Sequence, residues 1–502
     1  MALLRPCLSN VLNRYKIITN RHVTCLNLLR KRHHYSGQAI TAISDLLQDL
    51  GPQFYADGDK IRFLHQPTDF YQELLSKIKT AKKRITLASL YIGNGSLEQR
   101  MVDELQQVSR SSIQLNKPLD INILLDYTRG SRGKQNSRKM LLPLINESHS
   151  SVNVALFHTP HLRGPLKAIV PERFNETIGL SHLKVYLFDN DVIISGANLS
   201  DSYFVNRQDR YIVIEDNPEF ANFFQDLITV VSKYSLQLQP DDTTKMLEDI
   251  NVHPYENNDS SQEFINAMRS DIHQLLHKYK DSIKNNNLSK SNTVIFPLIQ
   301  MGPFEVRFDE EATQRLFGSL RKDSTLLLAS GYFNLIEKYL ATILTKSKGD
   351  YKILTAAPEA NGFYGASGIA GYIPDSYTYI AKQFYQRIVS ENQDQRIKLL
   401  EYERQGWTFH VKGLWYYYQQ EQLPSMTLIG SSNFGYRSTY RDLEAQIAVV
   451  TSESNLQELM KAEQESIFSY GKAVNQDVFR SDRRQVAFWA QMVTKYILWK
   501  FL

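Results

Sequence analysis

The sequence predicts an α/β protein built from two similar halves. Short apolar runs of the kind that form buried strands alternate with stretches of helical periodicity. Strands expected at 84–91 and 121–126 in the first half are matched by strands at 324–332 and 351–355 in the second. Each half then reaches a His-x-Lys tripeptide, an apolar strand and a turn with Gly and Asn. This recurrence is typical of an internal duplication.

Composition narrows the class of protein. The chain has 502 residues, with 42% hydrophobic and 22% charged residues, which is typical of globular domains. No run of about 18 apolar residues occurs, so a membrane-spanning helix is not expected. Cys7 and Cys25 are the two cysteines of the sequence. The rest of the chain therefore has neither a disulfide framework nor a cysteine-ligated zinc site.

The first 44 residues differ from the remainder in charge. They contain seven Lys and Arg and no Asp or Glu, and the remaining chain carries a net charge of −2. An Arg-rich, acid-free start without an apolar core of about 7–15 residues predicts a mitochondrial transit peptide and disordered lead-in over 1–44, with cleavage near Tyr35–Ser36. A basic arm for an anionic partner is the alternative. The nearly neutral body argues against nucleic acid as a partner.

We expect four further segments. The first domain spans 45–240, a polar connector 241–290, the second domain 291–475 and a C-terminal amphipathic helix 476–502. The C-terminal helix either docks on the core or lies in a membrane interface. Apolar residues spaced by three and four predict an amphipathic helix in the connector that packs on a domain: Phe264, Ile265, Met268, Ile272, Leu275, Leu276 and Tyr279.

The two His-x-Lys tripeptides carry the candidate chemistry. They are His182 with Lys184 and His410 with Lys412. Positions i and i+2 of a strand point to the same face, so each histidine lies beside a fixed cation. One such tripeptide is a weak signal. Two, each followed by the same strand and turn, are strong.

An asparagine and an acid follow each tripeptide. Asn198 is followed eleven residues later by Asp209, and Asn433 eleven residues later by Glu444. The asparagine amides are candidates for donating to a phosphoryl oxygen, and Ser431 is a further candidate for binding the substrate phosphate. Each carboxylate is a candidate for bonding the far nitrogen of an imidazole and setting its tautomer.

Brought together, these residues form one site for phosphoryl transfer. A neutral imidazole attacks phosphorus, and the opposite imidazolium protonates the leaving oxygen. Lys and Asn neutralise the non-bridging oxygens, a role often taken by a metal. The path is a covalent phosphohistidine that an alcohol or water then attacks. No metal or other cofactor is required, and the effect of divalent cations is left open.

This pattern resembles the phospholipase D superfamily, whose motif is His-x-Lys-x4-Asp followed by Gly-x-Asn or Gly-Ser-x-Asn. The first copy matches through Asp189, and the second has Ser431 in place but Tyr417 at the Asp position. The resemblance spans about 45–475. It implies two α/β sandwich domains related by a pseudo-twofold axis, with the site in the seam. It also implies a catalytic role for Asp189 and, by analogy, His182 as nucleophile and His410 as acid/base. The sequence leaves open which histidine attacks first.

Within that superfamily, three segments resemble the eukaryotic mitochondrial phosphatidylglycerophosphate synthases, which also lack the second Asp. The segments are 195–200, 410–415 and 429–438. The resemblance implies transfer of phosphatidyl from CDP-diacylglycerol to sn-glycerol 3-phosphate with release of CMP, towards phosphatidylglycerol and cardiolipin. Such a substrate implies a peripheral enzyme on the matrix face of the inner membrane, with 483–502 as a candidate anchor. Oligomeric state is left open.

Two further sets of basic residues are candidate phosphate contacts. Arg437 and Arg441 are candidates for the acceptor phosphate, with a surface ion pair of Arg441 to Asp442 or Glu444 as the alternative. A glycine-rich loop after a strand is a candidate diphosphate cradle, with a plain surface loop as the alternative. Its residues are Arg129, Gly130, Arg132, Gly133 and Lys134.

Other functions remain open at this stage. A cardiolipin synthase or phospholipase D-type hydrolase would keep the histidines and change the acceptor. A nucleic-acid phosphodiesterase would need a basic groove with interleaved aromatic residues. An inactive binding module would be expected to have lost a histidine or lysine. Release of CMP in step with product distinguishes the transferase.

Overall fold

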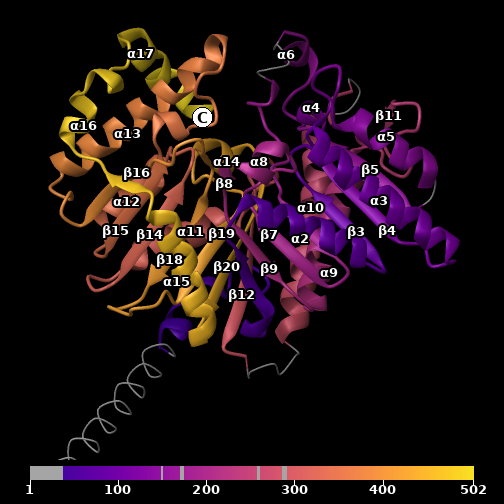
Figure 1. Ribbon diagram of the computed structural model, residues 1–502, viewed down its shortest axis with the longest axis horizontal. Coiled ribbons are helices and arrows are strands. Elements are labelled where there is room, and N and C mark those ends of the chain that lie inside the picture. The colour runs from indigo at the N-terminus through magenta and orange to yellow at the C-terminus, as the bar shows by residue number, and fades with distance from the viewer. Residues whose placement is uncertain (1–37, 149–150, 170–174, 257–259, 285–290) are drawn as a thin grey trace, which may run out of the picture.

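The computed structural model describes residues 38–148, 151–169, 175–256, 260–284 and 291–502 (Figure 1). Within these residues, two large mixed sheets stand side by side, one from each half of the sequence. The predicted transit peptide lies in 1–37, outside the described residues.

The first sheet has nine strands. Its three central strands are parallel, and the neighbours on both sides are antiparallel. In spatial order the strands are β11 (Thr244–Lys245), β10 (Leu236–Leu238), β5 (Val152–Phe157), β4 (Asp120–Asp126), β3 (Arg84–Ala88), β6 (Val185–Phe188), β7 (Asp191–Ser195), β9 (Tyr211–Ile214) and β2 (Ile61–Leu64).

The second sheet has ten strands. In spatial order nine of them are β1 (Phe54–Tyr55), β12 (Thr293–Met301), β20 (Leu443–Thr451), β19 (Met426–Gly430), β18 (Lys412–Tyr417), β14 (Thr325–Ser330), β15 (Asp350–Ala356), β16 (Ile397–Tyr402) and β21 (Gly471–Ala473), and β13 (Val306–Arg307) pairs with β12. The strands β14, β15 and β16 are parallel.

The two sheets repeat one arrangement. Read from β10 to β2, the first sheet has the strand order and orientation that the second has from β21 to β12. In each sheet the parallel strands precede the His-x-Lys motif in the sequence, and the strand at that motif pairs with the first of them. The predicted duplication is therefore present in the topology, and the twofold relation between the halves stays a prediction.

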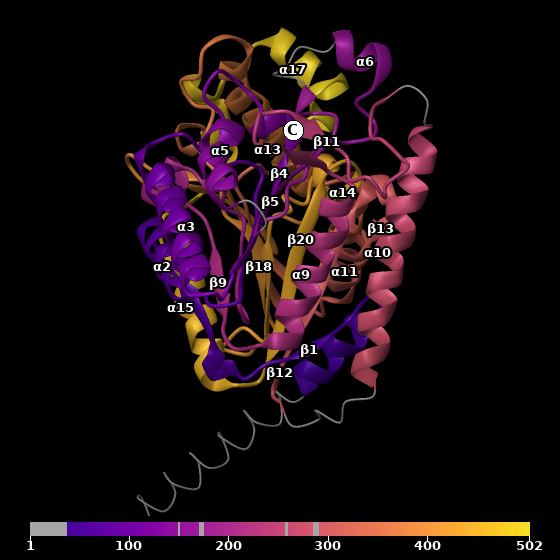
Figure 2. The same ribbon diagram turned by 90° about the vertical axis from the view of Figure 1, so that its right-hand side faces the viewer.

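Helices cover the outer face of each sheet and fill the space between the sheets (Figures 1 and 2). The outer helices on the first sheet are α2 (Pro67–Thr80), α3 (Ser96–Gln114) and α5 (Ser137–Ser148), and those on the second are α11 (Phe308–Ser319), α12 (Glu337–Thr345) and α13 (Ile373–Ser390). The inner helices are α9 (Pro218–Lys233), α10 (Ser261–Lys284) and α15 (Ser454–Phe468). The largest apolar cluster contains inner-face residues of both sheets, so the halves share one core.

Local sequence explains the helices that were expected. Helix α2 begins at Pro67, whose fixed backbone angle suits a first turn, and buries Phe70, Leu74 and Ile78 at intervals of four residues. The connector helix is α10. Its residues Phe264 and Ile272 are buried in the core that α9 also lines.

The start of the first domain is predicted wrongly. Residues 38–47 are helical rather than a disordered lead-in. Their apolar residues Ala39, Ile43 and Leu47, spaced by four, are buried in the outer core of the second sheet. Strand β1 then pairs with β12. Residues 38–55 therefore pack on and pair with the second sheet, and the first sheet begins only at β2. A boundary at residue 45 does not separate the two halves.

The single C-terminal helix predicted for 476–502 is also wrong. The segment forms α16 (Gln476–Arg480) and α17 (Phe488–Tyr496), with a 3-10 turn at Asp482–Arg484 between them. Arg484 is buried and its guanidinium lies 2.7 Å from the Glu401 carboxylate, which fixes the turn on β16. Other 3-10 turns are Gly58–Lys60, Gly302–Phe304, Pro358–Ala360, Gly368–Tyr372 and Leu498–Lys500. Among the described helices, none is long and apolar enough to cross a membrane.

Candidate active site

Backbone pairing across the seam fixes both histidines. The amide of His182 donates to the carbonyl of Leu443 at 2.8 Å, and the amide of His410 donates to the carbonyl of Gln208 at 2.9 Å. A two-stranded sheet of β8 (Arg207–Gln208) and β17 (Thr408–Phe409) supports the second contact. Each histidine is thus held by the backbone of the opposite half.

Each predicted orienting acid contacts the histidine of the other half. Glu444 of the second half lies 2.9 Å from Nδ1 of His182, and Asp209 of the first half lies 2.7 Å from Nδ1 of His410. Each Nδ1–H therefore donates to a carboxylate, which leaves Nε2 as the basic nitrogen. Burial raises the pKa of Asp209 to about 6, against the opposing effect of Lys412.

The two lysines lie under the histidines. Lys184 Nζ donates to the carbonyl of His182 at 2.9 Å, and Lys412 Nζ donates to that of His410 at 2.8 Å. Both side chains are fully buried. Burial holds the pKa of Lys184 well below its usual range and lowers the pKa of Lys412 to about 8. Burial thus disfavours the charged form of both amines, most strongly for Lys184.

The surroundings of both histidines favour the neutral imidazole. Burial lowers the pKa of each imidazole well below its usual range, and the neighbouring lysine of each motif adds to the effect. Lys412 Nζ lies 2.7 Å from Nδ1 and 3.1 Å from Nε2 of His410, which disfavours an imidazolium there.

Tyr203 was missed by the sequence patterns. It lies on α8 (Asp201–Val205), and its hydroxyl is 3.1 Å from Nε2 of His410. Asn198 donates to the same hydroxyl from Nδ2, also at 3.1 Å. Among the described residues, none is hydrogen-bonded to Nε2 of His182. The side chain of His182 is 12% exposed and that of His410 is 4% exposed, so His182 is the more open of the two.

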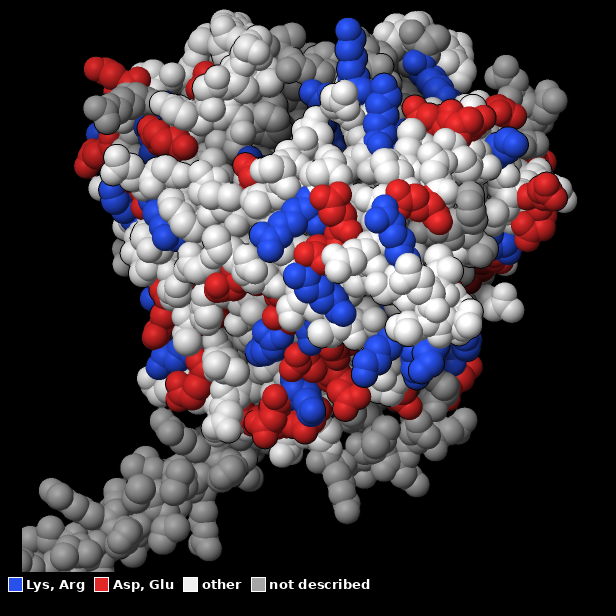
Figure 3. Space-filling view, turned by 45° about the vertical axis from the view of Figure 1, so that its right-hand side comes forward, with Lys and Arg blue, Asp and Glu red and all other residues white. Residues whose placement is uncertain are grey.

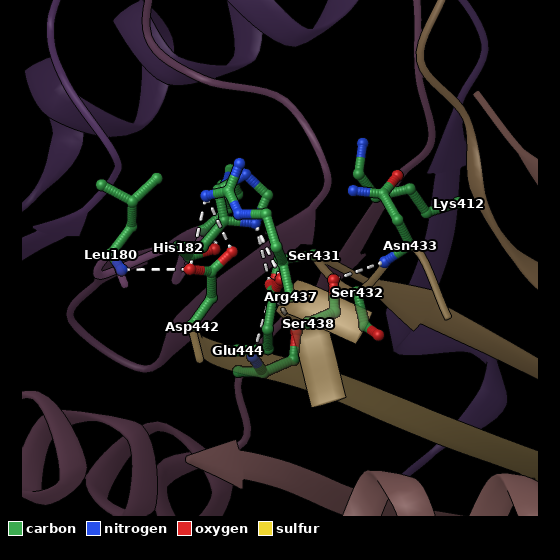
Figure 4. A network of polar contacts seen from close by, with 12 residues as sticks. Leu180, His182, Lys412, Ser431, Ser432, Asn433, Arg437, Ser438, Asp442 and Glu444 are labelled. Atoms are coloured by element: carbon green, nitrogen blue, oxygen red, sulfur yellow. Dashed lines mark hydrogen bonds and ion pairs between the residues drawn. The ribbon is translucent and has the colours of Figure 1, made fainter. Parts of the chain in front are cut away.

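The asparagines and Ser431 have different surroundings. The side-chain oxygens of Asn198 and Asn433 are buried without a partner within the described part of the chain. These atoms are acceptors, so any bond from either asparagine to a phosphoryl oxygen must come from its NH2 group. Ser431 instead accepts from the amide of Ala445 at 3.1 Å and hydrogen-bonds Glu444. It therefore supports the orienting acid. Figure 4 shows Glu444, Asp442 and Arg437 around His182, with Lys412 and Asn433 to one side.

Asp189, predicted as catalytic, lies elsewhere. It follows the far end of β6 and has a positive φ of 54°. Its carboxylate accepts the amides of Lys82, Lys83 and Arg84 at 2.7–3.1 Å. The residue fixes the turn into β3. Motif spacing could not reveal this. Lys184 precedes β6 and Asp189 follows it, so the strand places the two residues at its opposite ends.

The arginines predicted for the acceptor phosphate are already occupied. Arg437 lies 3.0 Å from the Asp442 carboxylate and donates to the carbonyl of Glu176 at 3.0 Å. Arg441 donates to the carbonyl of Thr177 at 2.7 Å and stacks on Phe501. The ion pair considered for Arg441 is formed by Arg437, which is the arginine beside His182.

The predicted diphosphate loop is partly folded onto the protein. Residues Tyr127–Gly130 form the short helix α4, and Arg129 stacks on Tyr91 at 4.2 Å. Arg132 lies 2.9 Å from Glu176, while Gly133 and Lys134 are exposed. The carboxylate of Asp126, before the loop, accepts the amides of Arg129 and Ser181. The loop thereby supports the residue before His182.

A buried ion pair also joins the halves. Arg210 and Glu463 lie 2.7 Å apart, both nearly inaccessible, and the guanidinium stacks on Trp415 at 3.8 Å. Arg210 follows the orienting Asp209, so this pair anchors the acid. Within the described residues, no group of three or more His, Cys, Asp or Glu side chains is placed to hold a metal ion.

Comparison with known proteins identifies the family. Residues 74–229 match the family model described as "Cardiolipin synthase, PLD-like domain". The mitochondrial CDP-diacylglycerol–glycerol-3-phosphate 3-phosphatidyltransferase of Gallus gallus is 46% identical over 90% of this chain and 85% of its own length. The Homo sapiens protein of that name is 45% identical over 90% of this chain and 84% of its own. The chain belongs to this phosphatidyltransferase family.

A solved structure supports the fold of the family member described here. The phosphatidylserine synthase of Haemophilus influenzae superposes with a TM-score of 0.68 at 19% identity, covering 92% of this chain and 100% of that chain. At this identity the likeness concerns the fold alone. The predicted α/β fold of phospholipase D type is confirmed by this match and by the family model.

Proposed function

We propose that this chain transfers the phosphatidyl group of CDP-diacylglycerol to sn-glycerol 3-phosphate through a phosphohistidine, releasing CMP. The names of the relatives supply the substrates. The observation that carries the mechanism is the pair of histidines, each bonded at Nδ1 by a carboxylate of the opposite half. Two such bases on one phosphate provide one nucleophile and one general base.

In the first step, Nε2 of His182 attacks the phosphorus next to diacylglycerol. The phosphorus–nitrogen bond forms as the bond to the CMP oxygen breaks, and Glu444 stabilises the positive charge on the imidazole. CMP departs as a phosphate monoester whose last pKa is about 6, so it needs no proton to leave. Lys184, Lys412, Asn198 and Asn433 are the donors for the non-bridging oxygens.

In the second step, His410 acts as the base. Its Nε2 takes the proton of the glycerol phosphate hydroxyl while that oxygen attacks phosphorus and the bond to His182 breaks. Asp209 then stabilises the His410 imidazolium, which loses its proton to solvent. A base that rests neutral is suited to this step. No metal enters the chemistry.

The test is product analysis with the purified full chain, CDP-diacylglycerol in detergent micelles and sn-glycerol 3-phosphate. Acceptor-dependent CMP and phosphatidylglycerophosphate are expected, and both are lost in His182→Ala. His277→Ala, on the exposed side of α10, is the matched control with full activity. Phosphatidic acid formed regardless of acceptor would instead indicate a hydrolase. Absence of CMP would favour a cardiolipin synthase or phospholipase.

The same proposal places the enzyme at the matrix face of the mitochondrial inner membrane as a peripheral protein. Helix α17 exposes large apolar side chains, with Phe488 at 76% and Tyr496 at 63% exposure. It lies at the upper end of the molecule in Figure 1. In Figure 3 the charged residues are dense on the lower part, whereas the upper part has more neutral surface, with Lys and Arg at the top centre and Asp and Glu on both upper sides. Such a surface suits an anionic bilayer.

Liposome sedimentation tests this association. In Phe488→Ser/Trp489→Ser, we expect binding to cardiolipin-containing vesicles to fall about tenfold, since each side chain loses apolar area buried in lipid. Leu115→Ser, an equally exposed leucine outside α17 at 71% exposure, is the control. Equal sedimentation of both variants and the parent would remove α17 as the contact.

A further inference from the structure

The basic residues around the reaction centre differ in how their charge is balanced. Arg437 is paired with Asp442, and Arg441 is bonded to a backbone carbonyl and an aromatic ring. Arg207 was singled out by no sequence pattern. Among the described residues, no carboxylate lies within ion-pair distance of its guanidinium. A half-buried cation without a counter-ion is a binding group for an anion.

The contacts of Arg207 place it on the His410 side of the seam. It lies on β8, and its Nε donates to the hydroxyl of Thr408 at 3.1 Å. The guanidinium stacks on the ring of Tyr203 at 4.6 Å, and the hydroxyl of that ring reaches Nε2 of His410. Arg207 also hydrogen-bonds the Tyr203 side chain, so the Tyr203 hydroxyl joins the cation to the general base.

The loop opposite is close to the same cation. A Cβ at Gly362 would lie 3.1 Å from the guanidinium of Arg207 and 2.9 Å from the hydroxyl of Tyr332. The ring of Tyr332 in turn packs edge-on against His410 at 5.3 Å. Arg207 is thus enclosed by tyrosine rings and backbone, in a site where a charge-assisted bond is little weakened by water.

The direction of the reaction decides which substrate meets this cation. In a two-step displacement, His182 attacks from one side of phosphorus, and both the departing CMP and the incoming alcohol occupy the other side. The alcohol must present its hydroxyl to Nε2 of His410. A glycerol phosphate so placed carries its phosphate on the third carbon from that hydroxyl, and Arg207 is the cation beside Tyr203 on this side of the seam.

We infer that Arg207 binds the phosphate of the acceptor, with Tyr203 holding the acceptor hydroxyl at His410, and this rests on the function proposed above. Two guanidinium N–H groups face the phosphate oxygens in the fork geometry that suits them. When the acceptor binds, the hydrogen bond between the Tyr203 hydroxyl and Nε2 of His410 breaks, and the hydroxyl bonds the acceptor oxygen instead. The acceptor subsite is then selective for a phosphorylated alcohol over glycerol or water.

The test compares acceptors with and without a phosphate. In Arg207→Gln, kcat/KM for sn-glycerol 3-phosphate is expected to fall about 10- to 150-fold, the range for a lost charge-assisted hydrogen bond. Transfer to glycerol, hydrolysis by water and the burst of CMP without acceptor are expected to stay within about twofold. Arg207→Lys restores part of the loss, because it keeps the charge without the fork.

Arg404→Gln is the matched control, an arginine that stacks on Trp407 at 3.4 Å outside the reaction centre. It is expected to leave the ratio between the two alcohols unchanged. An equal loss with phosphorylated and phosphate-free acceptors in Arg207→Gln, or a slower CMP burst, would overturn the assignment, because Arg207 would then serve the nucleotide or the fold. If the unaltered enzyme releases no CMP, the proposed function fails instead, and the two failures are distinguishable.

Discussion

The two sides of the seam are built from one motif and are not equivalent. Five residues after the motif asparagine, the first half has Tyr203 and the second has Ser438. The tyrosine hydroxyl reaches Nε2 of His410, whereas Ser438 accepts from the amide of Asn433 and stays on the Glu444 side. One histidine is therefore capped and the other is open. In the proposed mechanism, this one side chain is what distinguishes the nucleophile from the base.

The last motif position gives a second contrast. Asp189 binds three backbone amides at one end of β6, and its counterpart Tyr417 donates to Gln464 of α15 at 2.9 Å. Both residues hold a strand end, by different chemistry. Replacing the Asp by Tyr in the second copy therefore costs the site nothing, because neither residue belongs to the site.

Substituting the two histidines one at a time is expected to give the largest effects and to distinguish the first step, CMP release, from the second, transfer to the acceptor. His182→Ala should lose the CMP burst and all transfer, by on the order of 10⁴-fold or more, since no other group forms the intermediate. His410→Ala should keep a burst of about one CMP per enzyme and lose turnover by about 10²- to 10⁴-fold, the range for a general base. Rapid-quench measurement of CMP distinguishes them. Equal loss of the burst in both variants would show that the first step needs His410.

The orienting acids test the exchange between halves. Glu444→Gln should slow the CMP burst, because it acts on His182, and Asp209→Asn should slow transfer to the acceptor with the burst retained. We expect each effect to be about a hundredfold, since a misoriented tautomer removes much of a base's contribution. Single-turnover rates check both. A slower burst in Asp209→Asn, with slower transfer alone in Glu444→Gln, would contradict the roles proposed for the two histidines.

The pH dependence of the His410 side gives a smaller effect. Lys412 has its pKa lowered to about 8 by burial, so it is charged below that pH and neutral above it. Transfer should therefore fall as pH rises through about 8, by up to tenfold per unit. In Lys412→Arg the fall should move beyond pH 10, because arginine stays protonated. If the fall in rate at high pH stays near pH 8 in Lys412→Arg, another group is responsible for it.

Asp189 should give the smallest change in rate. Asp189→Ala removes the acceptor of three amides and should cost about 1–3 kcal/mol of unfolding free energy, with kcat and KM unchanged. Urea unfolding and initial rates measure the two quantities. Asp201→Ala, an exposed acid at the start of α8, controls for loss of a surface charge. A loss of kcat without loss of stability would return Asp189 to the catalytic set.

Sequence patterns predicted the main structural elements and most of the site residues of this molecule. The duplicated strands, the connector helix and the eight residues of the paired motif follow from periodicity and spacing, which depend on nearest neighbours along the chain. The lead-in at 38–55 and the broken C-terminal segment were missed. Their structure is set by contacts with the second sheet, through Ile43 and Leu47 in one case and Arg484 in the other.

By itself, the sequence determined which residues carry the chemistry and that they come in two sets. Hydrophobic period and motif spacing are local properties, and they fix strands, helices and the side on which each His and Lys points. Only the tertiary structure decided which acid serves which histidine, that Tyr203 caps one of them, and that Arg207 lies beside Tyr203 without an ion pair among the described residues. These relations join residues about 200 positions or more apart, or depend on burial, and no local pattern encodes them.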